Sequence, residues 1–193
     1  MSRVYEQLPE GYRLIQEVDL QKNKKLAIGI NGAAVAVSLV LGWLGHRIVP
    51  ITKLFDFSQG MGMYILRFLI LMAVAVAYIV LHEAVHGIVM KAFGARKVRY
   101  GFTGLYAFAG TDAYFDKFSY IVVALAPVVV WGIVLAVVNA FVPATWFWVV
   151  YLTQITNLSG AAGDIYVTAK FSKLPADLLV HDHGTGMKVY SKN

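Results

Sequence analysis

The segment His82-Glu83-Ala84-Val85-His86 places two imidazoles and one carboxylate at a spacing that suits metal chemistry. On a helix, residues four positions apart lie on one face, one turn from each other. His82 and His86 can therefore bind one zinc ion, and Glu83 can act as general base on a water at that metal. With five His and four Glu in 193 residues, the expected number of chance matches to this pattern is roughly 0.003 per chain. The spacing predicts a zinc site with a base beside it.

The composition excludes most classes of soluble protein. Hydrophobic residues make up 59% of the chain and charged residues 15%, against about 45–50% and about 25% in soluble domains. A chain of 193 residues cannot bury so much apolar side chain in its own core, so we expect lipid to be its solvent. The net charge of +6 comes from Lys and Arg between apolar runs, which favours an anionic lipid surface and no nucleic acid. With no cysteine in the chain, disulfides and thiolate metal sites are excluded.

Four apolar runs are about long enough to cross a bilayer. They cover residues 26–45, 68–90, 118–142 and 145–169, between a polar leader over 1–25 and a polar tail over 170–193. Pro127 lies inside the third run and predicts a kink there. We therefore predict a single membrane domain over 1–193, an all-α integral membrane protein with about four transmembrane helices.

The positions of Lys and Arg predict the orientation of these helices in the cell membrane. With both termini on one side, fourteen of the 17 Lys and Arg lie on that side and three on the other. Cytoplasmic loops carry the excess of positive charge in multi-pass proteins. We therefore expect the N and C termini, with the leader and the tail, in the cytoplasm.

Residues 96–117, between the second and third runs, differ in pattern from the rest of the chain. Val98, Tyr100 and Phe102 alternate with charged or small residues, and glycines follow at 104 and 110. Such alternation, bounded by glycines, is typical of a short β-hairpin. We expect a small cytoplasmic hairpin at the membrane interface between spans two and three.

A zinc ion on two His needs a further protein ligand, and Asp164 is the strongest candidate because it is the only charged residue of the fourth run. Counted from the predicted cytoplasmic ends of their spans, His86, Asp164 and His82 lie about 8, 9 and 14 Å deep at 1.5 Å per residue. Two spans can thus bring these three ligands to a similar depth in the membrane. Asp112 and Asp116 are alternative ligands, but their loop position favours capping or solvation.

Asn157 and the tail segment His181-Asp182-His183 each allow two interpretations. Asn157 lies seven residues before Asp164, about two turns along one helix face. Its amide could stabilise the oxyanion formed on a substrate carbonyl, or it could hold two helices together. The small residues between them would allow a close helix approach or a local break where a peptide could enter. The tail segment resembles a metal clip, but its polar surroundings favour a solvated position.

These residues resemble the site-2 protease family of intramembrane zinc metalloproteases. The resemblance rests on the His82–His86 segment, on Ala126-Pro127 in the next span, and on the stretch 157–164 in the last span. It covers roughly residues 68–169, and it implies a zinc ion on the two His and Asp164, with β structure near the hairpin. Asp164 stands in Gly163-Asp164-Ile165, where that family has Asn-Pro-Asp-Gly or Leu-Asp-Gly.

A second resemblance covers nearly the whole chain. The leader segment Leu8-Pro9-Glu10-Gly11-Tyr12 and the overall size are similar to those of a bacterial family described as "putative zincin peptidases". Together, the two resemblances imply a hydrolase rather than a passive membrane protein.

The sequence thus predicts a zinc-dependent intramembrane endopeptidase that cleaves a transmembrane or membrane-anchored peptide near the cytoplasmic leaflet. Zn²⁺ is expected on His82, His86 and Asp164, with Glu83 and Asn157 as catalytic residues. The alternative is a metal-binding membrane protein without hydrolytic activity, such as a carrier, a scaffold or an inactive relative. Haem ligation by both His is disfavoured, because two His one turn apart on one helix cannot take opposite faces of a haem.

Overall fold

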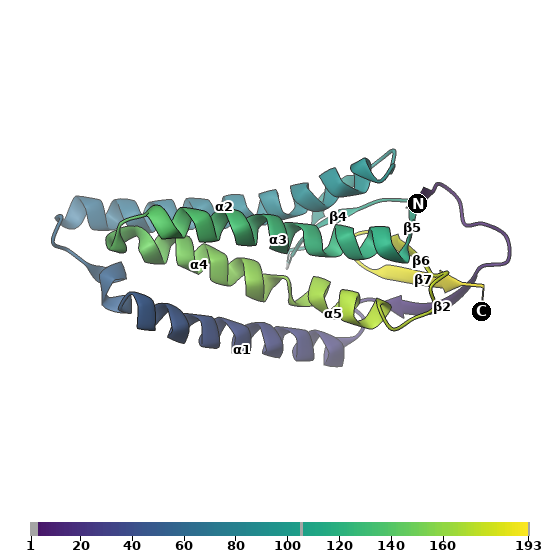
Figure 1. The fold of residues 1–193 in the computed structure, drawn as a ribbon, viewed down its shortest axis with the longest axis horizontal. Helices are drawn as coiled ribbons and strands as arrows, with labels where there is room; N and C mark the ends of the chain where they lie inside the picture. Colours follow the sequence, from purple (N-terminus) through teal and green to yellow (C-terminus); the bar gives the residue numbers. More distant parts are fainter. Residues whose placement is uncertain (1–3, 105, 193) are drawn as a thin grey trace. The chain divides into compact units, whose positions relative to one another are not determined.

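A computed structural model describes residues 4–104 and 106–192 of the chain (Figure 1). Residues 1–3 of the predicted leader, Leu105 of the predicted hairpin region and Asn193 of the predicted tail lie outside the described residues. The chain divides into two compact units. The first unit comprises the segments up to residue 30, 81–127 and from 163 onward, and the second unit comprises 31–80 and 128–162.

Most of the described chain is helical. The helices are α1 (Lys24–Ile48), the 3-10 helix η1 (Ile51–Phe55), α2 (Met61–Ala92), α3 (Lys117–Phe141), α4 (Ala144–Gly160) and α5 (Ala162–Phe171). Among the described residues, three helices, α1, α2 and α3, are long and apolar enough to cross a membrane. They correspond to the first three predicted spans and confirm helical structure there.

The fourth predicted span, 145–169, is not one continuous helix. It is divided into α4 and α5 at Ala161, whose ψ of 10° leaves the helical range. The division falls between Gly160 and Gly163, and glycine disfavours a helix interior because it loses the most backbone freedom on folding. Four spans are therefore not confirmed, and the local break considered for this stretch is present.

The all-α prediction is not confirmed either, because the first unit contains a five-stranded antiparallel sheet in the order β1-β5-β6-β7-β2. Its strands are β1 (Val4–Tyr5), β2 (Arg13–Val18), β5 (Tyr114–Asp116), β6 (Leu179–Asp182) and β7 (Met187–Ser191). The predicted hairpin is confirmed as β3 (Arg99–Phe102) paired with β4 (Ala107–Gly110). The leader and the tail thus form strands, where we expected a polar cytoplasmic leader and a tail with a solvated His181-Asp182-His183 segment.

The tail joins the sheet because it contains a few apolar residues that become buried, although most of its residues are polar. Leu178, Val180 and Val189 are fully buried. They pack in one cluster with Val167 and Phe171 of α5 and with the first turns of α3. The sheet therefore packs against α5, which bears Asp164, and against the first turns of α3, which bear Val123.

Candidate metal centre

Helix α2 presents His82 and His86 on one face, as their spacing predicts. The two ring centroids lie 5.0 Å apart, with the ring planes at 77° to each other. His86 is buried and His82 is partly buried. The two imidazoles are thus close enough to face one shared point.

Asp164 lies in the first turn of α5, in the same unit as both His. His82 Nε2 is 3.5 Å from Asp164 Oδ2, and His86 Nε2 is 3.7 Å from Asp164 Oδ1. One ligand atom from each of the three residues lies within 4.8 Å of the others. Zinc holds N and O ligands at about 2.0–2.2 Å, so tetrahedral neighbours lie about 3.4 Å apart. The observed spacing fits a shared zinc ion.

The protonation pattern of His86 supports the same conclusion. Its Nδ1 lies 2.9 Å from the backbone oxygen of Val123, and a carbonyl oxygen can only accept a hydrogen bond. Nδ1 therefore donates this hydrogen bond, and Nε2, which lies 3.7 Å from Asp164 Oδ1, is the ring nitrogen that could bind a metal. A carbonyl that orients a ligating imidazole in this way is the usual outer partner of a metal-bound His.

Glu83 lies beside the two ligating positions and meets the hairpin. The backbone N–H of Ala109 in β4 lies within hydrogen-bonding reach of its carboxylate. Glu83 is partly buried rather than exposed to solvent. A carboxylate held in this way, next to two metal-ligand candidates, can take a proton from a water in the site.

A close backbone approach brings the hairpin to this helix. Gly87 follows His86 in the sequence, and a Cβ atom added at Gly87 would collide with the Tyr100 hydroxyl of β3. The absence of a side chain therefore lets β3 pack against α2 beside the candidate ligands. This packing explains why the predicted hairpin lies next to the predicted site.

The structure places the other candidate residues elsewhere. Asn157 lies in the second unit and is fully buried. It accepts a hydrogen bond from the Tyr78 hydroxyl at 2.9 Å and donates one to the Val128 oxygen at 3.2 Å. This arrangement is what the helix-holding interpretation requires, and an oxyanion role for Asn157 stays a prediction.

The two alternative carboxylate ligands have other roles in the structure. Asp112 is exposed and forms a bidentate pair with Arg99, at 2.7 Å for both contacts. Asp116 accepts a hydrogen bond from the Ser119 N–H at the start of α3. The expectation that loop carboxylates are capped or solvated therefore describes both residues.

Sequence reasoning missed the carboxylate of Asp182. It is buried in β6, where it accepts hydrogen bonds from the Tyr120 hydroxyl at 2.8 Å and from the Gly184 N–H. Burial raises the pKa of Asp182, and the charges of His86 and Asp164 act on it as well. Its place in the tail gave no sign of burial, although the preceding residues Leu178 to Val180 are apolar. Asp182 thus belongs to the electrostatic surroundings of the candidate centre.

A small cavity of about 140 Å³ adjoins Asp164. It is lined by β2, the start of α5 and the turn before β7, with Tyr106 of the hairpin on its wall. Its residues are Val18, Leu20, Ile30, Tyr106, Gly163, Asp164, Tyr166, Val167, Gly184, Thr185, Gly186 and Met187. The cavity thus reaches Asp164, whereas His82, Glu83 and His86 are not among the described residues that line it.

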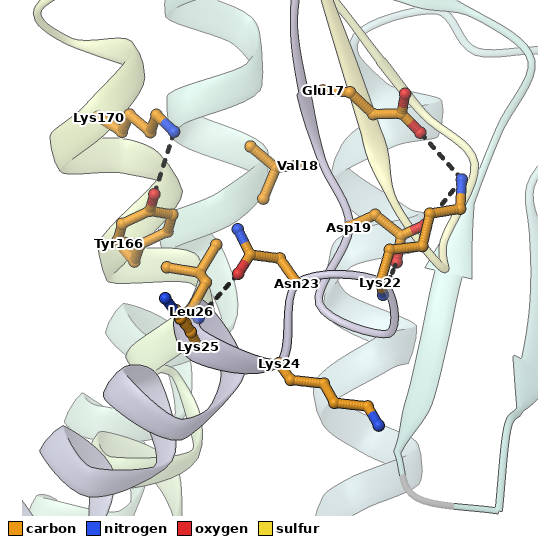
Figure 2. Close-up of a pocket in the computed structure, with 10 residues that line it drawn as sticks. All are labelled: Glu17, Val18, Asp19, Lys22, Asn23, Lys24, Lys25, Leu26, Tyr166 and Lys170. Atoms are coloured by element: carbon orange, nitrogen blue, oxygen red, sulfur yellow. Dashed lines mark hydrogen bonds and ion pairs between the residues drawn. The ribbon is translucent and has the colours of Figure 1, made fainter.

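A larger cavity of about 620 Å³ lies where β2 leads into α1 (Figure 2). Among the described residues that line it, none is a candidate ligand or base. Figure 2 shows its Lys22 turned toward Glu17 and Asp19, with which it forms ion pairs at 3.3 Å. Cavity size alone would therefore point away from the residues that can do chemistry.

Comparisons with known proteins agree with this site. A protein from Pyrococcus woesei with the name "Uncharacterized 24.7 kDa protein in gap 5'region" is 27% identical to this chain over 181 residues, which cover 90% of the chain and 73% of the relative. No solved structure matches the chain. The profile of a family described as "Putative zincin peptidase" matches residues 75–179, a stretch that includes both His, Glu83 and Asp164. The chain therefore belongs to this family of zincin peptidases.

Proposed function

We propose that the protein is a zinc-dependent intramembrane endopeptidase of the site-2 protease type. Its substrate is a transmembrane or membrane-anchored peptide, cleaved near the cytoplasmic leaflet. The observation that carries the proposal is the convergence of His82, His86 and Asp164 within 4.8 Å, with Glu83 adjacent to the first ligand. The apolar helices α1, α2 and α3 support a membrane location for the parts of the chain that lead to this site.

Each residue of the site has a distinct task in peptide hydrolysis. His82, His86 and Asp164 hold the metal, which when bound polarises a water and the scissile carbonyl. Glu83 removes a proton from the attacking water and delivers it to the amine that leaves. Val123 fixes the ring of His86 through the hydrogen bond to Nδ1. The chain thus supplies both the base and the ligand orientation that the reaction needs.

The hairpin offers a way to bind the peptide next to Glu83. In an antiparallel ladder, alternate residues direct their N–H groups to opposite sides of a strand. The Ala109 N–H reaches Glu83, so β4 turns the edge that it does not share with β3 toward the site. Ala107 lies two residues earlier and shares that edge. An extended stretch of substrate can pair with this edge by strand addition, after its helix has unwound to expose the scissile carbonyl.

Charge supports the orientation of the proposed enzyme. The sheet and the hairpin are joined to the ends of α1, α2 and α3 that carry Lys24, Lys91 and Lys117. An excess of Lys and Arg marks the cytoplasmic side of multi-pass proteins. We infer that both termini and the first unit's strands lie on the cytoplasmic side of the cell membrane, near the lipid headgroups.

A cleavage assay on Glu83→Gln tests the proposal and separates it from the non-hydrolytic alternative. The amide cannot accept the proton, so we expect cleavage of a membrane-anchored peptide to fall by about 10²–10⁴-fold while the protein keeps its zinc. Reconstituted wild-type protein serves as the reference, and zinc content is measured on both samples. Cleavage unchanged by this substitution, at equal zinc content, contradicts the peptidase proposal and favours a metal carrier or scaffold.

A further inference from the structure

Pro127 interrupts the hydrogen bonding of α3 at a position that concerns the candidate metal centre. It lies inside the helix and is buried. In an α-helix the N–H of residue 127 would bond to the carbonyl of residue 123. Proline has no N–H, and its ring crowds that carbonyl. The Val123 oxygen is therefore left without its usual helical donor.

The structure shows which group takes this acceptor. His86 Nδ1 lies 2.9 Å from the Val123 oxygen. Both residues are shielded from solvent, with 8% of His86 and 1% of Val123 exposed. A buried carbonyl without a donor is unfavourable. The His86 Nδ1–H supplies the donor that Pro127 cannot, and the Val123 oxygen supplies the acceptor that this N–H needs. The other ring nitrogen then faces Asp164 at 3.7 Å.

We propose that Pro127 is a positioning residue for the metal centre: it frees the Val123 carbonyl, which fixes the tautomer and the ring orientation of His86. Any other residue at position 127 would supply an N–H that competes for the same oxygen. The His86 ring would then lose its outer partner, although every ligand atom would still be present. The inference rests on the proposed zinc site but not on any peptidase activity.

The test compares Pro127→Ala with Pro143→Ala in the full chain in lipid nanodiscs. Pro143 precedes α4 in the second unit, outside the unit that holds the site, so its substitution controls for the loss of a proline. Zinc affinity is measured by competition with a chelator, and stability by thermal unfolding. We expect Pro127→Ala to bind zinc about 10–100-fold more weakly, the range seen when an outer partner is lost. Its melting temperature should be unchanged or higher, because a helix-breaking residue has been removed.

A merely structural role predicts a different pattern. If Pro127→Ala lowers zinc affinity and melting temperature together, or leaves zinc affinity as in Pro143→Ala, the proposal is wrong. A second measurement needs no variant: ¹⁵N spectra of the histidines in the metal-free wild-type protein. They should show His86 protonated at Nδ1, and a proton at Nε2 instead would overturn the proposal. Failure of the peptidase proposal would appear separately, as absent cleavage with zinc affinity and tautomer as expected.

Discussion

The two compact units each bury polar side chains among apolar helices, and they do so in opposite ways. In the second unit, Asn157 donates to one partner and accepts from another, so its amide is matched by complementary groups. In the first unit, His82 Nε2 and His86 Nε2 lie 3.5 and 3.7 Å from the two oxygens of the Asp164 carboxylate. Matched donors and acceptors hold helices together, whereas three groups that can each bind a metal, gathered around one point, suit a shared cation. Burial of a polar residue therefore does not by itself indicate a functional site.

Arg67 gives the same lesson for a charged residue. It is fully buried in the second unit, and its guanidinium donates to the backbone oxygens of Thr145 and Asp56. These contacts tie α2 to the loop that precedes it and to the first turn of α4. The buried charge of Arg67 thus has a structural explanation, whereas the partly buried carboxylate of Asp164 faces two candidate metal ligands.

The largest effect should come from removing the acceptor that completes the cluster. Asp164→Ala takes away one of the three candidate ligands, and we expect loss of stoichiometric zinc, because two imidazoles alone form an incomplete site. Asp112→Ala is the matched control, since Asp112 is an exposed carboxylate paired with Arg99 and such surface pairs contribute little. Zinc content after gel filtration measures both variants. Full zinc retention in Asp164→Ala would show that Asp164 is not a ligand.

A substitution in the second unit should separate stability from metal binding. Asn157→Ala removes the hydrogen bonds that Asn157 forms with the Tyr78 hydroxyl and the Val128 oxygen, and each lost hydrogen bond costs about 0.5–1.5 kcal/mol. We expect a lower melting temperature with unchanged zinc content. Thr156→Ala is the control, because Thr156 is exposed and its hydroxyl donates to the Leu152 oxygen one turn earlier on the same helix. A loss of zinc in Asn157→Ala would show that Asn157 contributes to zinc binding, contrary to this comparison.

A substitution that disturbs the packing of the hairpin on α2 should reduce stability as much as Asn157→Ala, or less. A methyl group at Gly87 meets the Tyr100 ring, and overpacking of this kind costs about 1–3 kcal/mol. We expect Gly87→Ala to lower the melting temperature and cleavage, because β4 would move away from Glu83. The double variant Gly87→Ala/Tyr100→Ala should recover most of both losses. If the double variant behaves like the single one, the contact between Gly87 and Tyr100 is not what places the hairpin.

The smallest expected effect concerns the sheet of the first unit. Hydrogen bonds from the Lys192 N–H and the Ser191 hydroxyl lower the pKa of Asp177. A carboxyl with a lowered folded pKa stabilises the protein above its unfolded value of 3.8, and this contribution is lost as the pH falls through the folded value. Asp177→Asn should slightly lower the free energy of unfolding at neutral pH. The difference in this free energy between the variant and the wild type should become smaller in acid. Unfolding curves from pH 7 to pH 2 measure this, and equal stability of the two proteins at every pH would contradict it.

The ligands could be predicted from the sequence because each one carries its own signal. The spacing of four residues between His82 and His86 indicates one helix face, and Asp164 is the only charged residue in its apolar run. The hairpin was predictable because its alternation is local. The five-stranded sheet was not, because its pairs join segments far apart in the chain, such as Arg13 with Ser191. Asp182 was missed for the same reason, since the strands beside it and Tyr120 of α3 lie far from it in the chain.

X-ray absorption at the zinc edge of the purified protein tests the central claim most directly. We predict one zinc per chain, with N and O ligands at about 2.0–2.1 Å and the scattering pattern of two imidazoles. In His86→Ala that pattern should fall to one imidazole or the zinc should be lost. Purified protein that binds no zinc, or a coordination shell unchanged in His86→Ala, would contradict a metal centre built from these residues.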